Sequence, residues 1–301
     1  MKRIQYYALS LLIRFGVFMS TVLPERTVTA FSTGLSRLCF PFFRRYCKRA
    51  SDNLSIAFGP ALDREKLHRI RKVLATNMGL NLAEVVCSAT DKKERILDRI
   101  TLHGTENLNR ALAGGKGVIA FSAHMGNFML LGAKMIEQGY PFTVLVKESK
   151  HQTVAYALRR LQQKQGGRYI YIKPWRPALL QLLGCLKRNE IVCLIADENK
   201  RRSGITVDFL GHSAPTAIGP AVLTLRTGAP LLPVFILRNG DSRHDIYIEP
   251  HLELNLNGNA NENIRTITAA YTKVIEHYVR RYPEQWFWIN NRWKKEKPKR
   301  S

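Results

Sequence analysis

The sequence has few acidic residues, few cysteines and no uninterrupted run of about twenty apolar residues. Its five cysteines form no Cys-x-x-Cys pair, which argues against zinc and disulfides and favours reduced thiols in a cytosol-facing protein. The missing apolar runs exclude a polytopic membrane protein. Neither glycine-rich nucleotide-binding motif occurs, and the eight histidines show no metal-ligand spacing. We therefore expect neither a cofactor nor a metal ion.

Positive charge is in large excess. The 301 residues include 47 lysines and arginines but only 23 aspartates and glutamates, a net charge of +24, which favours a polyanionic partner. Residues 1–50 hold nine basic residues and one acidic residue, and they also contain the most continuous apolar sequence. This coincidence favours an anionic membrane surface. No recognition module for nucleic acid is present, so we expect no nucleic-acid partner.

Two apolar stretches form the N-terminal part. The first, Tyr6 to Leu23, contains Arg14, which costs about 2.5–3.5 kcal/mol at the centre of a membrane-spanning helix, so we expect a helix lying in or on the membrane. Arg14 also disfavours a secretory signal. The second, Val28 to Phe43, precedes a basic cluster at positions 44–49 and is typical of an interfacial helix, the alternative being a solvated charged face.

The rest of the chain predicts an α/β fold with a mostly parallel central sheet flanked by helices. Short, β-branched apolar runs alternate with segments of helical period, the composition of strands buried on both faces. A helix is expected from Asp63 onward. We predict two parts, membrane-associated helices over 1–50 and an α/β domain over 51–301. The expected strands are 118–121, 143–146, 169–172, 191–195 and 231–236.

Candidate catalytic residues follow two of these strands. Ligands bind at the carboxyl ends of strands in open α/β sheets. His124 comes directly after the 118–121 strand and precedes Gly126, so its imidazole is a candidate general base, the alternative being a structural histidine. Asp197 and Glu198 end the 191–195 strand, where a carboxylate can orient an imidazole.

Candidate substrate-binding residues lie in the same loops. Cations at a strand end can hold phosphate, which makes Arg201 and Arg202 candidates and Lys147, after another strand, a third. A further candidate, Asn127, lies in the predicted turn after the 118–121 strand. Gly211 and Thr216 are candidates in a glycine-containing stretch before the 231–236 strand.

Read together, these segments resemble the bacterial lipid A late acyltransferases, the lauroyl and myristoyl acyltransferase family within the lysophospholipid acyltransferase superfamily. The similarity extends over roughly residues 20–295, and the most specific part is Pro283-Glu-Gln-Trp-Phe-Trp288 with its continuation to Lys294. The segments that carry it are 49–58, 115–119, 122–128, 197–199, 209–211, 226–230 and 282–288.

The resemblance implies an acyltransferase on the cytoplasmic face of the bacterial inner membrane. Such an enzyme moves a fatty acyl chain from a thioester of acyl carrier protein, or of coenzyme A, to a hydroxyl of a lipid A precursor or a related anionic glycolipid or phospholipid. The alternatives are an acyltransferase for another lysolipid or aminolipid, and a catalytically impaired member that only binds lipid.

One residue departs from the family pattern. The family places an Asp or Glu after His and four intervening residues, and here that position is Met129, which cannot orient an imidazole. Three explanations stay open. The carboxylate comes from elsewhere, with Asp197 the first candidate and Glu198 the second; His124 acts alone, held by Asn127 or a backbone carbonyl; or acyl transfer has been lost.

Overall fold

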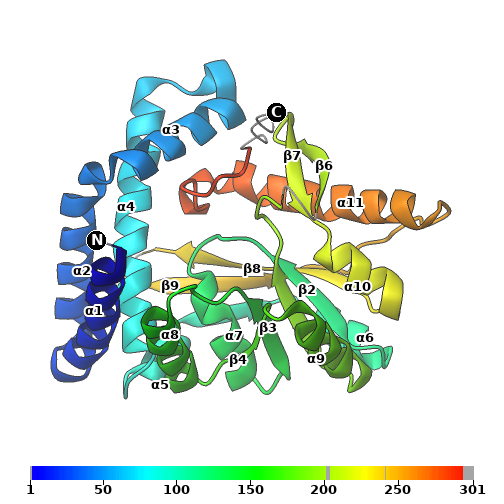
Figure 1. The fold of residues 1–301 in the computed structure, drawn as a ribbon, viewed down its shortest axis with the longest axis horizontal. Helices are drawn as coiled ribbons and strands as arrows, with labels where there is room; N and C mark the ends of the chain where they lie inside the picture. Colours follow the sequence, from blue (N-terminus) through cyan, green and yellow to red (C-terminus); the bar gives the residue numbers. More distant parts are fainter. Residues whose placement is uncertain (1, 201–203, 241, 294–301) are drawn as a thin grey trace.

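The protein, described by a computed structural model over residues 2–200, 204–240 and 242–293, is organised around a seven-stranded sheet (Figure 1). The strand order is β1-β9-β8-β2-β5-β3-β4. β8 and β9 are antiparallel, and the other neighbouring strands are parallel. The strands are β1 (Ile100–His103), β2 (Val118–Ser122), β3 (Phe142–Val146), β4 (Arg168–Tyr171), β5 (Ile191–Ile195), β8 (Leu231–Asn239) and β9 (Arg243–Ile248).

Helices cover both faces of this sheet, and β2 shows how the two cores are separated. Val118 and Ala120 belong to one hydrophobic core with α5, α6 and α7, whereas Ile119 and Phe121 belong to another with α9, α10 and α11. A strand buried on both faces is continuously apolar, which explains the sequence of β2. These helices are α5 (Lys93–Leu97), α6 (Thr105–Ala113), α7 (Phe128–Glu137), α9 (Trp175–Lys187), α10 (Gly219–Thr227) and α11 (Ala260–Arg281).

The N-terminal helices form a layer beside the sheet, drawn in blue and cyan in Figure 1. They are α1 (Lys2–Val22), α2 (Glu25–Cys39), η1 (Phe40–Phe42), α3 (Arg44–Phe58), η2 (Gly59–Ala61) and α4 (Arg64–Cys87). α2 lies so close to α4 that a Cβ at Gly79 would be 2.6 Å from Thr33 Cα. α1 packs on α4 and on α8 (Gln152–Gln165), where Tyr6 stacks on His151 just before the helix begins.

The outward side of α1 and α2 is rich in exposed apolar side chains. None of the helices in the described part of the chain is both long and apolar enough to span a membrane. The membrane association of residues 1–50 and the division at residue 50 remain predictions. The exposed side chains include Leu9, Leu11, Leu12, Phe15, Phe18 and Val22 on α1, and Phe31, Leu35 and Leu38 on α2.

The predicted α/β class and mostly parallel sheet are confirmed, and each of the five expected strands is present. The helix expected from Asp63 is α4, and the Asp63 side chain accepts a hydrogen bond from the Lys66 N–H at 2.6 Å. The sequence did not predict β1, β9 or the antiparallel hairpin of β6 (Gly204–Phe209) and β7 (His212–Ala217). A short 3-10 helix, η3 (Pro283–Gln285), opens the C-terminal segment.

Candidate active site

The turn after β2, residues 123–127, has a backbone conformation that requires glycine at its centre. Gly126 has a φ of +52°, and a Cβ there would be 2.3 Å from the Ile236 carbonyl oxygen. The turn also pairs with the C-terminal segment. The Phe287 N–H donates to the His124 carbonyl at 3.0 Å, and the Gly126 N–H donates to the Gln285 carbonyl at 3.1 Å. Residues distant in sequence therefore fix this turn, which we call the His124 turn.

Asp197 contacts His124 from the neighbouring strand. β2 and β5 are parallel with Ser122 opposite Ile195, so their next residues meet at the same edge of the sheet. The His124 Nδ1 lies 2.7 Å from Asp197 Oδ1. Asp197 Oδ2 accepts from the His124 N–H at 3.0 Å and from the Trp286 indole N–H at 2.8 Å. Asp197 is 2% exposed, so these contacts replace its hydration.

The hydrogen bonds define the protonation of this pair. A carboxylate only accepts, so in the neutral imidazole His124 Nδ1 carries the proton and Nε2 keeps its lone pair. Burial disfavours the imidazolium, but the charge and hydrogen bond of Asp197 outweigh burial and raise the pKa of His124 above its ordinary value. Burial likewise opposes the Asp197 anion, yet His124 and Trp286 lower the pKa of Asp197. The pair can therefore act as a strengthened base.

Aromatic rings surround the imidazole. The Phe128 ring meets it edge-on with centroids 4.8 Å apart, and the Phe287 ring is roughly parallel to it at 6.3 Å. The fully buried Trp286 donates to Asp197 from the same C-terminal segment. These rings give the imidazole surroundings that are less polar than water, and electrostatic interactions such as that between His124 and Asp197 are stronger in such surroundings.

Arg292 is a buried cation near the same carboxylate. It is 1% exposed, and its guanidinium lies 4.7 Å from the centre of the Phe209 ring. It donates to the Pro215 carbonyl and to Thr216 Oγ1, both at 2.7 Å. Burial lowers the pKa of Arg292 to about 10, and attraction to Asp197 partly opposes this. Arg292 thus adds positive potential that favours the Asp197 anion.

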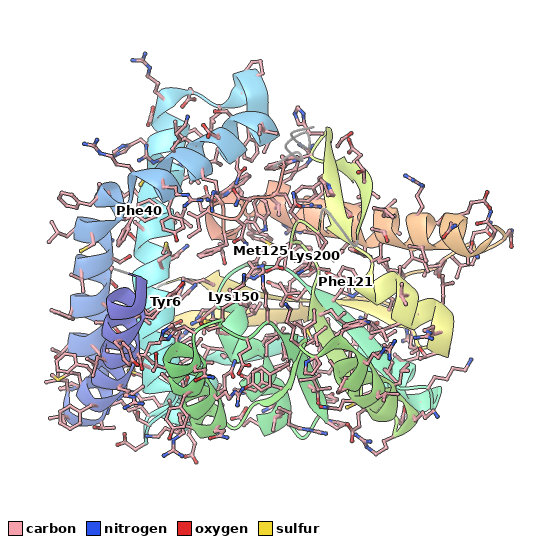
Figure 2. The ribbon with its side chains drawn as sticks, in the orientation of Figure 1. Tyr6, Phe40, Phe121, Met125, Lys150 and Lys200 are labelled. Carbon is pink, nitrogen blue, oxygen red and sulfur yellow. The ribbon has the colours of Figure 1, made fainter. Side chains whose placement is uncertain are left out.

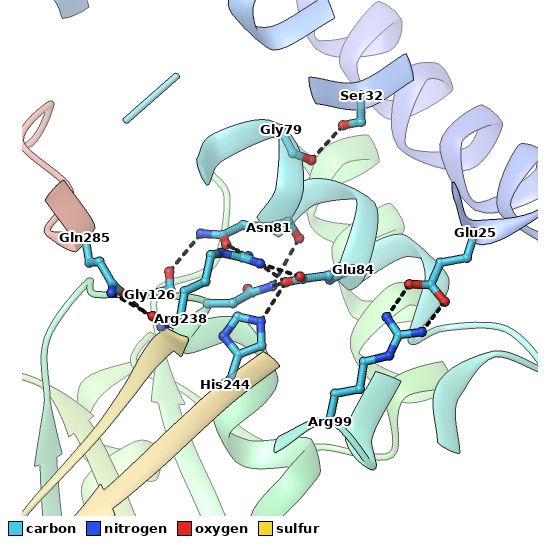
Figure 3. A network of polar contacts seen from close by, with 11 residues as sticks. Glu25, Ser32, Gly79, Asn81, Glu84, Arg99, Gly126, Arg238, His244 and Gln285 are labelled. Carbon is cyan, nitrogen blue, oxygen red and sulfur yellow. Dashed lines mark hydrogen bonds and ion pairs between the residues drawn. The ribbon is translucent and has the colours of Figure 1, made fainter. Parts of the chain in front are cut away.

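A second buried polar group lies behind the His124 turn (Figure 3). It consists of Asn81, Glu84, Asn127, Arg238 and His244, and we call it the Glu84 network. Glu84 accepts from Arg238 Nη1 at 2.6 Å, from Arg238 Nη2 at 2.8 Å and from Asn127 Nδ2 at 2.7 Å, and His244 Nε2 lies 3.0 Å from it. Burial opposes the charge, but His244 and Arg238 lower the pKa of Glu84 to about 2.

The structure brings together some of the residues that the sequence singled out as catalytic. His124 and Asp197 are in direct contact, as required if Asp197 replaces the family's acidic residue at position 129. Their catalytic roles remain predictions. Glu198 does not contact the imidazole; its carboxylate binds Lys200 at 2.8 Å. Met129 lies on the first turn of α7 and is 38% exposed. In Figure 2, Met125 of the turn and Lys200 of the loop after β5 both lie near the centre of the molecule.

The predicted substrate-binding residues are more dispersed. Asn127 is buried and donates to Glu84, and Thr216 is buried with its hydroxyl bound to Ala214 and Arg292, so neither side chain is available at the surface. The contacts with substrate expected of these two residues stay predictions. The other predicted positions are Gly211, exposed in the β6–β7 turn, Lys147, exposed after β3, and Arg201 and Arg202, which lie outside the described residues.

Several residues of the site were not predicted individually. Trp286 and Arg292 fall in the C-terminal segment that carried the resemblance, so a signal for them was present. Glu84 and Arg238 had none, because a single acid within a helix and a single base at a strand end are ordinary surface patterns. Within residues 2–200, 204–240 and 242–293, no cluster of three or more His, Cys, Asp or Glu side chains could hold a metal ion.

The fold and the site define a class of protein: an α/β protein with a half-buried histidine bound to a buried aspartate, an arrangement suited to proton abstraction, at the carboxyl ends of parallel strands. The family model of bacterial lipid A biosynthesis acyltransferases matches residues 1–295. The chain belongs to this acyltransferase family, which confirms the resemblance found in the sequence.

Individual relatives agree with this assignment. The chain is similar to the lipid A biosynthesis palmitoleoyltransferase of Escherichia coli (strain K12), 26% identical over 279 residues, covering 90% of this chain and 86% of that enzyme. It is also similar to the lauroyltransferase of the same strain, 24% identical over 281 residues, covering 90% and 87%. A phosphatidylinositol mannoside acyltransferase of Mycobacterium tuberculosis (strain CDC 1551 / Oshkosh) is 27% identical over 203 residues, covering 67% of this chain. The match spans 62% of the mycobacterial enzyme's length.

Proposed function

We propose that this protein transfers a fatty acyl chain from a thioester to a hydroxyl of a lipid A precursor or a related anionic glycolipid or phospholipid. The observation that carries the proposal is the 2.7 Å contact between His124 Nδ1 and Asp197 Oδ1, in a member of a lipid acyltransferase family. The pair supplies what the reaction needs, because a lipid hydroxyl becomes a good nucleophile only when a base removes its proton.

The proposed reaction uses His124 Nε2 as the base. Nε2 takes the proton of the acceptor hydroxyl as its oxygen attacks the thioester carbonyl, and the carbon–oxygen bond forms. The tetrahedral intermediate then collapses, the carbon–sulfur bond breaks, and the imidazolium returns the proton to the departing thiolate. Asp197 holds the imidazole in the required tautomer and stabilises its charged form through Oδ1. The products are an ester and a free thiol.

We propose acyl carrier protein as the donor's carrier, with coenzyme A as the alternative. Both present the acyl chain on a phosphate-bearing thiol, and the net charge of +24 suits either. The same charge suits an acceptor that carries phosphate. Lys147 is exposed at the carboxyl end of β3, two strands from β2, and remains a candidate phosphate contact.

We also propose that the enzyme works on the cytoplasmic face of the bacterial inner membrane. The exposed apolar side chains of α1 and α2 give it a surface that water solvates poorly, and Arg14, Arg26 and Arg37 lie exposed on the same helices. Apolar side chains interspersed with cations suit the interface of an anionic bilayer. A lipid acceptor can then reach the site without leaving the membrane surface.

A second acceptor class follows from the relatives. The mycobacterial enzymes named for phosphatidylinositol mannoside match this chain at an identity similar to that of the lipid A enzymes. Both acceptors are anionic lipids with sugar hydroxyls, which the same His–Asp pair can deprotonate.

The test is a product assay with the purified protein. Mixed acyl-carrier-protein and coenzyme A thioesters are incubated with lipid A precursor, with phosphatidylinositol mannoside and with a lysophospholipid mixture, and mass spectrometry identifies which lipid gains which chain. We expect an ester product whose formation falls by about 10²-fold or more in His124→Ala. Saturable lipid binding without any acylated product from either donor would refute the proposal in favour of a lipid-binding protein.

A further inference from the structure

Glu84 occupies an unusual place for a carboxylate. It lies within α4 and is 5% exposed, yet it contacts three segments that meet behind the His124 turn. Arg238 lies at the end of β8, His244 lies on β9, and Asn127 is the residue that precedes α7. Several donors hold a buried carboxylate in one position, because moving away from any of them leaves a buried polar group without a hydrogen bond.

Two contacts connect α4 directly to the His124 turn. Asn81, one helical turn before Glu84, donates through Nδ2 to the Gly126 carbonyl at 2.8 Å. Asn127 Nδ2 donates to Glu84 Oε2 at 2.7 Å and lies 3.3 Å from the Asn81 carbonyl. The backbone just after His124 is therefore held on one side by α4.

Arg238 provides a connection from the opposite side. Its guanidinium binds both Glu84 oxygens and donates to Asn81 Oδ1 at 2.6 Å. Its backbone N–H and carbonyl exchange hydrogen bonds with the Gln285 side chain, at 2.7 and 2.9 Å. The Gln285 carbonyl in turn accepts from the Gly126 N–H (Figure 3). Both connections end on the turn that carries His124.

We propose that Glu84 is a positioning residue of this enzyme, which holds the His124 turn through Asn127, Asn81 and Arg238 so that the imidazole meets Asp197. The inference rests on the proposed function, since it gives Glu84 a role in the same reaction. Glu84 touches neither the imidazole nor the site of the reacting atoms, so its effect passes through the turn. Burial opposes the Glu84 anion, but His244 and Arg238 lower its pKa to about 2, so the carboxylate is ionised at neutral pH.

The chain offers a matched control in Glu25. Glu25 forms a comparable paired contact with Arg99, at 2.5 and 2.9 Å, between α2 and the residue before β1. No contact of the Glu25–Arg99 pair reaches the His124 turn among the described residues (Figure 3). A merely structural role for Glu84 predicts that the Glu25→Gln and Glu84→Gln variants behave alike.

The experiment measures the pKa of His124 by NMR in histidine-labelled protein, with its signal among the eight histidines assigned from His124→Gln. Loosening of the contact with Asp197 should lower this pKa, by about half a unit or more, in Glu84→Gln and in Asn127→Ala. Asn127→Ala changes no charge, so a shift there cannot come from the removed Glu84 anion. Its control is Asn107→Ala, which removes one hydrogen bond to the Ile248 carbonyl.

Kinetics give the second readout. With the substrates found in the product assay, kcat should fall about tenfold or more in both test variants while KM changes by less than about threefold, because a displaced base affects chemistry rather than binding. The two changes combined should cost little more than one alone. The charged groups that influence His124, which are Asp197, Glu198 and Lys200, are unchanged throughout.

An unshifted pKa and unchanged kcat in folded Asn127→Ala would overturn the proposal, as would equal effects in the control variants. If Glu84→Gln does not fold, Asn127→Ala and its control decide alone. A wild-type protein without acyl-transfer activity would refute the proposed function, whereas the NMR comparison would still show whether the Glu84 network holds His124 against Asp197.

Discussion

Replacing Asp197 with asparagine tests the central contact of the site. The side chain keeps its shape but loses its charge and one acceptor oxygen, while the three donors around it remain. A hydrogen bond to a charged group contributes about 1.5–3 kcal/mol, which corresponds to roughly 10- to 150-fold in rate. A histidine left in the wrong tautomer loses more, up to about 10⁴-fold in serine proteases. We therefore expect kcat/KM to fall by about 10²-fold.

The pH dependence of the same variant gives an independent result. The proposed mechanism needs the neutral imidazole, so we expect kcat/KM to decrease as the pH falls below the pKa of His124. Asp197 raises that pKa, and removing its charge lowers it again. The acid limb of the profile should therefore move to lower pH by about one unit, while the plateau drops.

The control for this experiment is Asp245→Asn. Asp245 also contacts a histidine, His103, at 2.9 Å, but on β9 and β1 at the edge of the sheet. Its replacement should leave kcat/KM within about twofold and the pH profile unmoved. Thermal unfolding monitors the fold of both variants. Folded Asp197→Asn with wild-type kcat/KM would refute the reasoning, and so would full additivity with His124→Ala, because residues that act as a unit are not additive.

Three further outcomes are expected. Met129→Glu should restore activity about tenfold in the Asp197→Asn background, since it places a carboxylate on the first turn of α7; no gain would mean that this position does not reach His124. Gly126→Ala should lower the free energy of unfolding by about 2–4 kcal/mol in denaturant titrations, because its Cβ would meet the Ile236 carbonyl. Salt at about 1 M should release only part of the protein from anionic vesicles, and Phe15→Glu should increase that fraction; complete release of wild type would exclude apolar insertion.

The sequence predicts the centre of the sheet well because its strands are buried on both faces. β2 and β5 are continuous apolar runs, and such runs separated by helical segments identify parallel strands. β1 and β9 escaped prediction because exposed residues interrupt their apolar pattern, whereas β4, at the opposite edge of the sheet, was predicted from its run Tyr169-Ile170-Tyr171. Their short alternating sequences resemble those of many loops.

The contact between His124 and Asp197 was within reach of sequence reasoning, since both follow predicted parallel strands. That β2 and β5 are neighbours was not, because strand order depends on how the helices cross between them. The burial of Thr216 was also beyond prediction. It follows from Arg292, whose guanidinium enters the β6–β7 hairpin from the C-terminal segment and binds the Thr216 hydroxyl.

The Glu84 network could not be predicted from the sequence at all. Its carboxylate and its arginine partner are 154 positions apart, and they meet only because α4 crosses behind the ends of β8 and β9. Nothing in the local sequence of α4 distinguishes Glu84 from a solvated helical glutamate. The contact exists because a buried carboxylate needs hydrogen-bond donors in the folded protein, and the helical period of the sequence does not reveal that need.

The contact of the C-terminal segment with the His124 turn has a consequence for biosynthesis. A ribosome delivers His124 and Asp197 long before Trp286, which lies 89 positions after Asp197. Until that indole and the neighbouring backbone emerge, the nascent chain has no partners for the His124 carbonyl and the Gly126 N–H, and Asp197 Oδ2 has only the His124 N–H as a donor. Folding of the sheet can precede this step, since early segments fold as they are made. In the proposed mechanism, the turn that carries the base is therefore fixed only late in translation, and a chain that ends before this segment can bury a core while its His124 turn lacks these contacts.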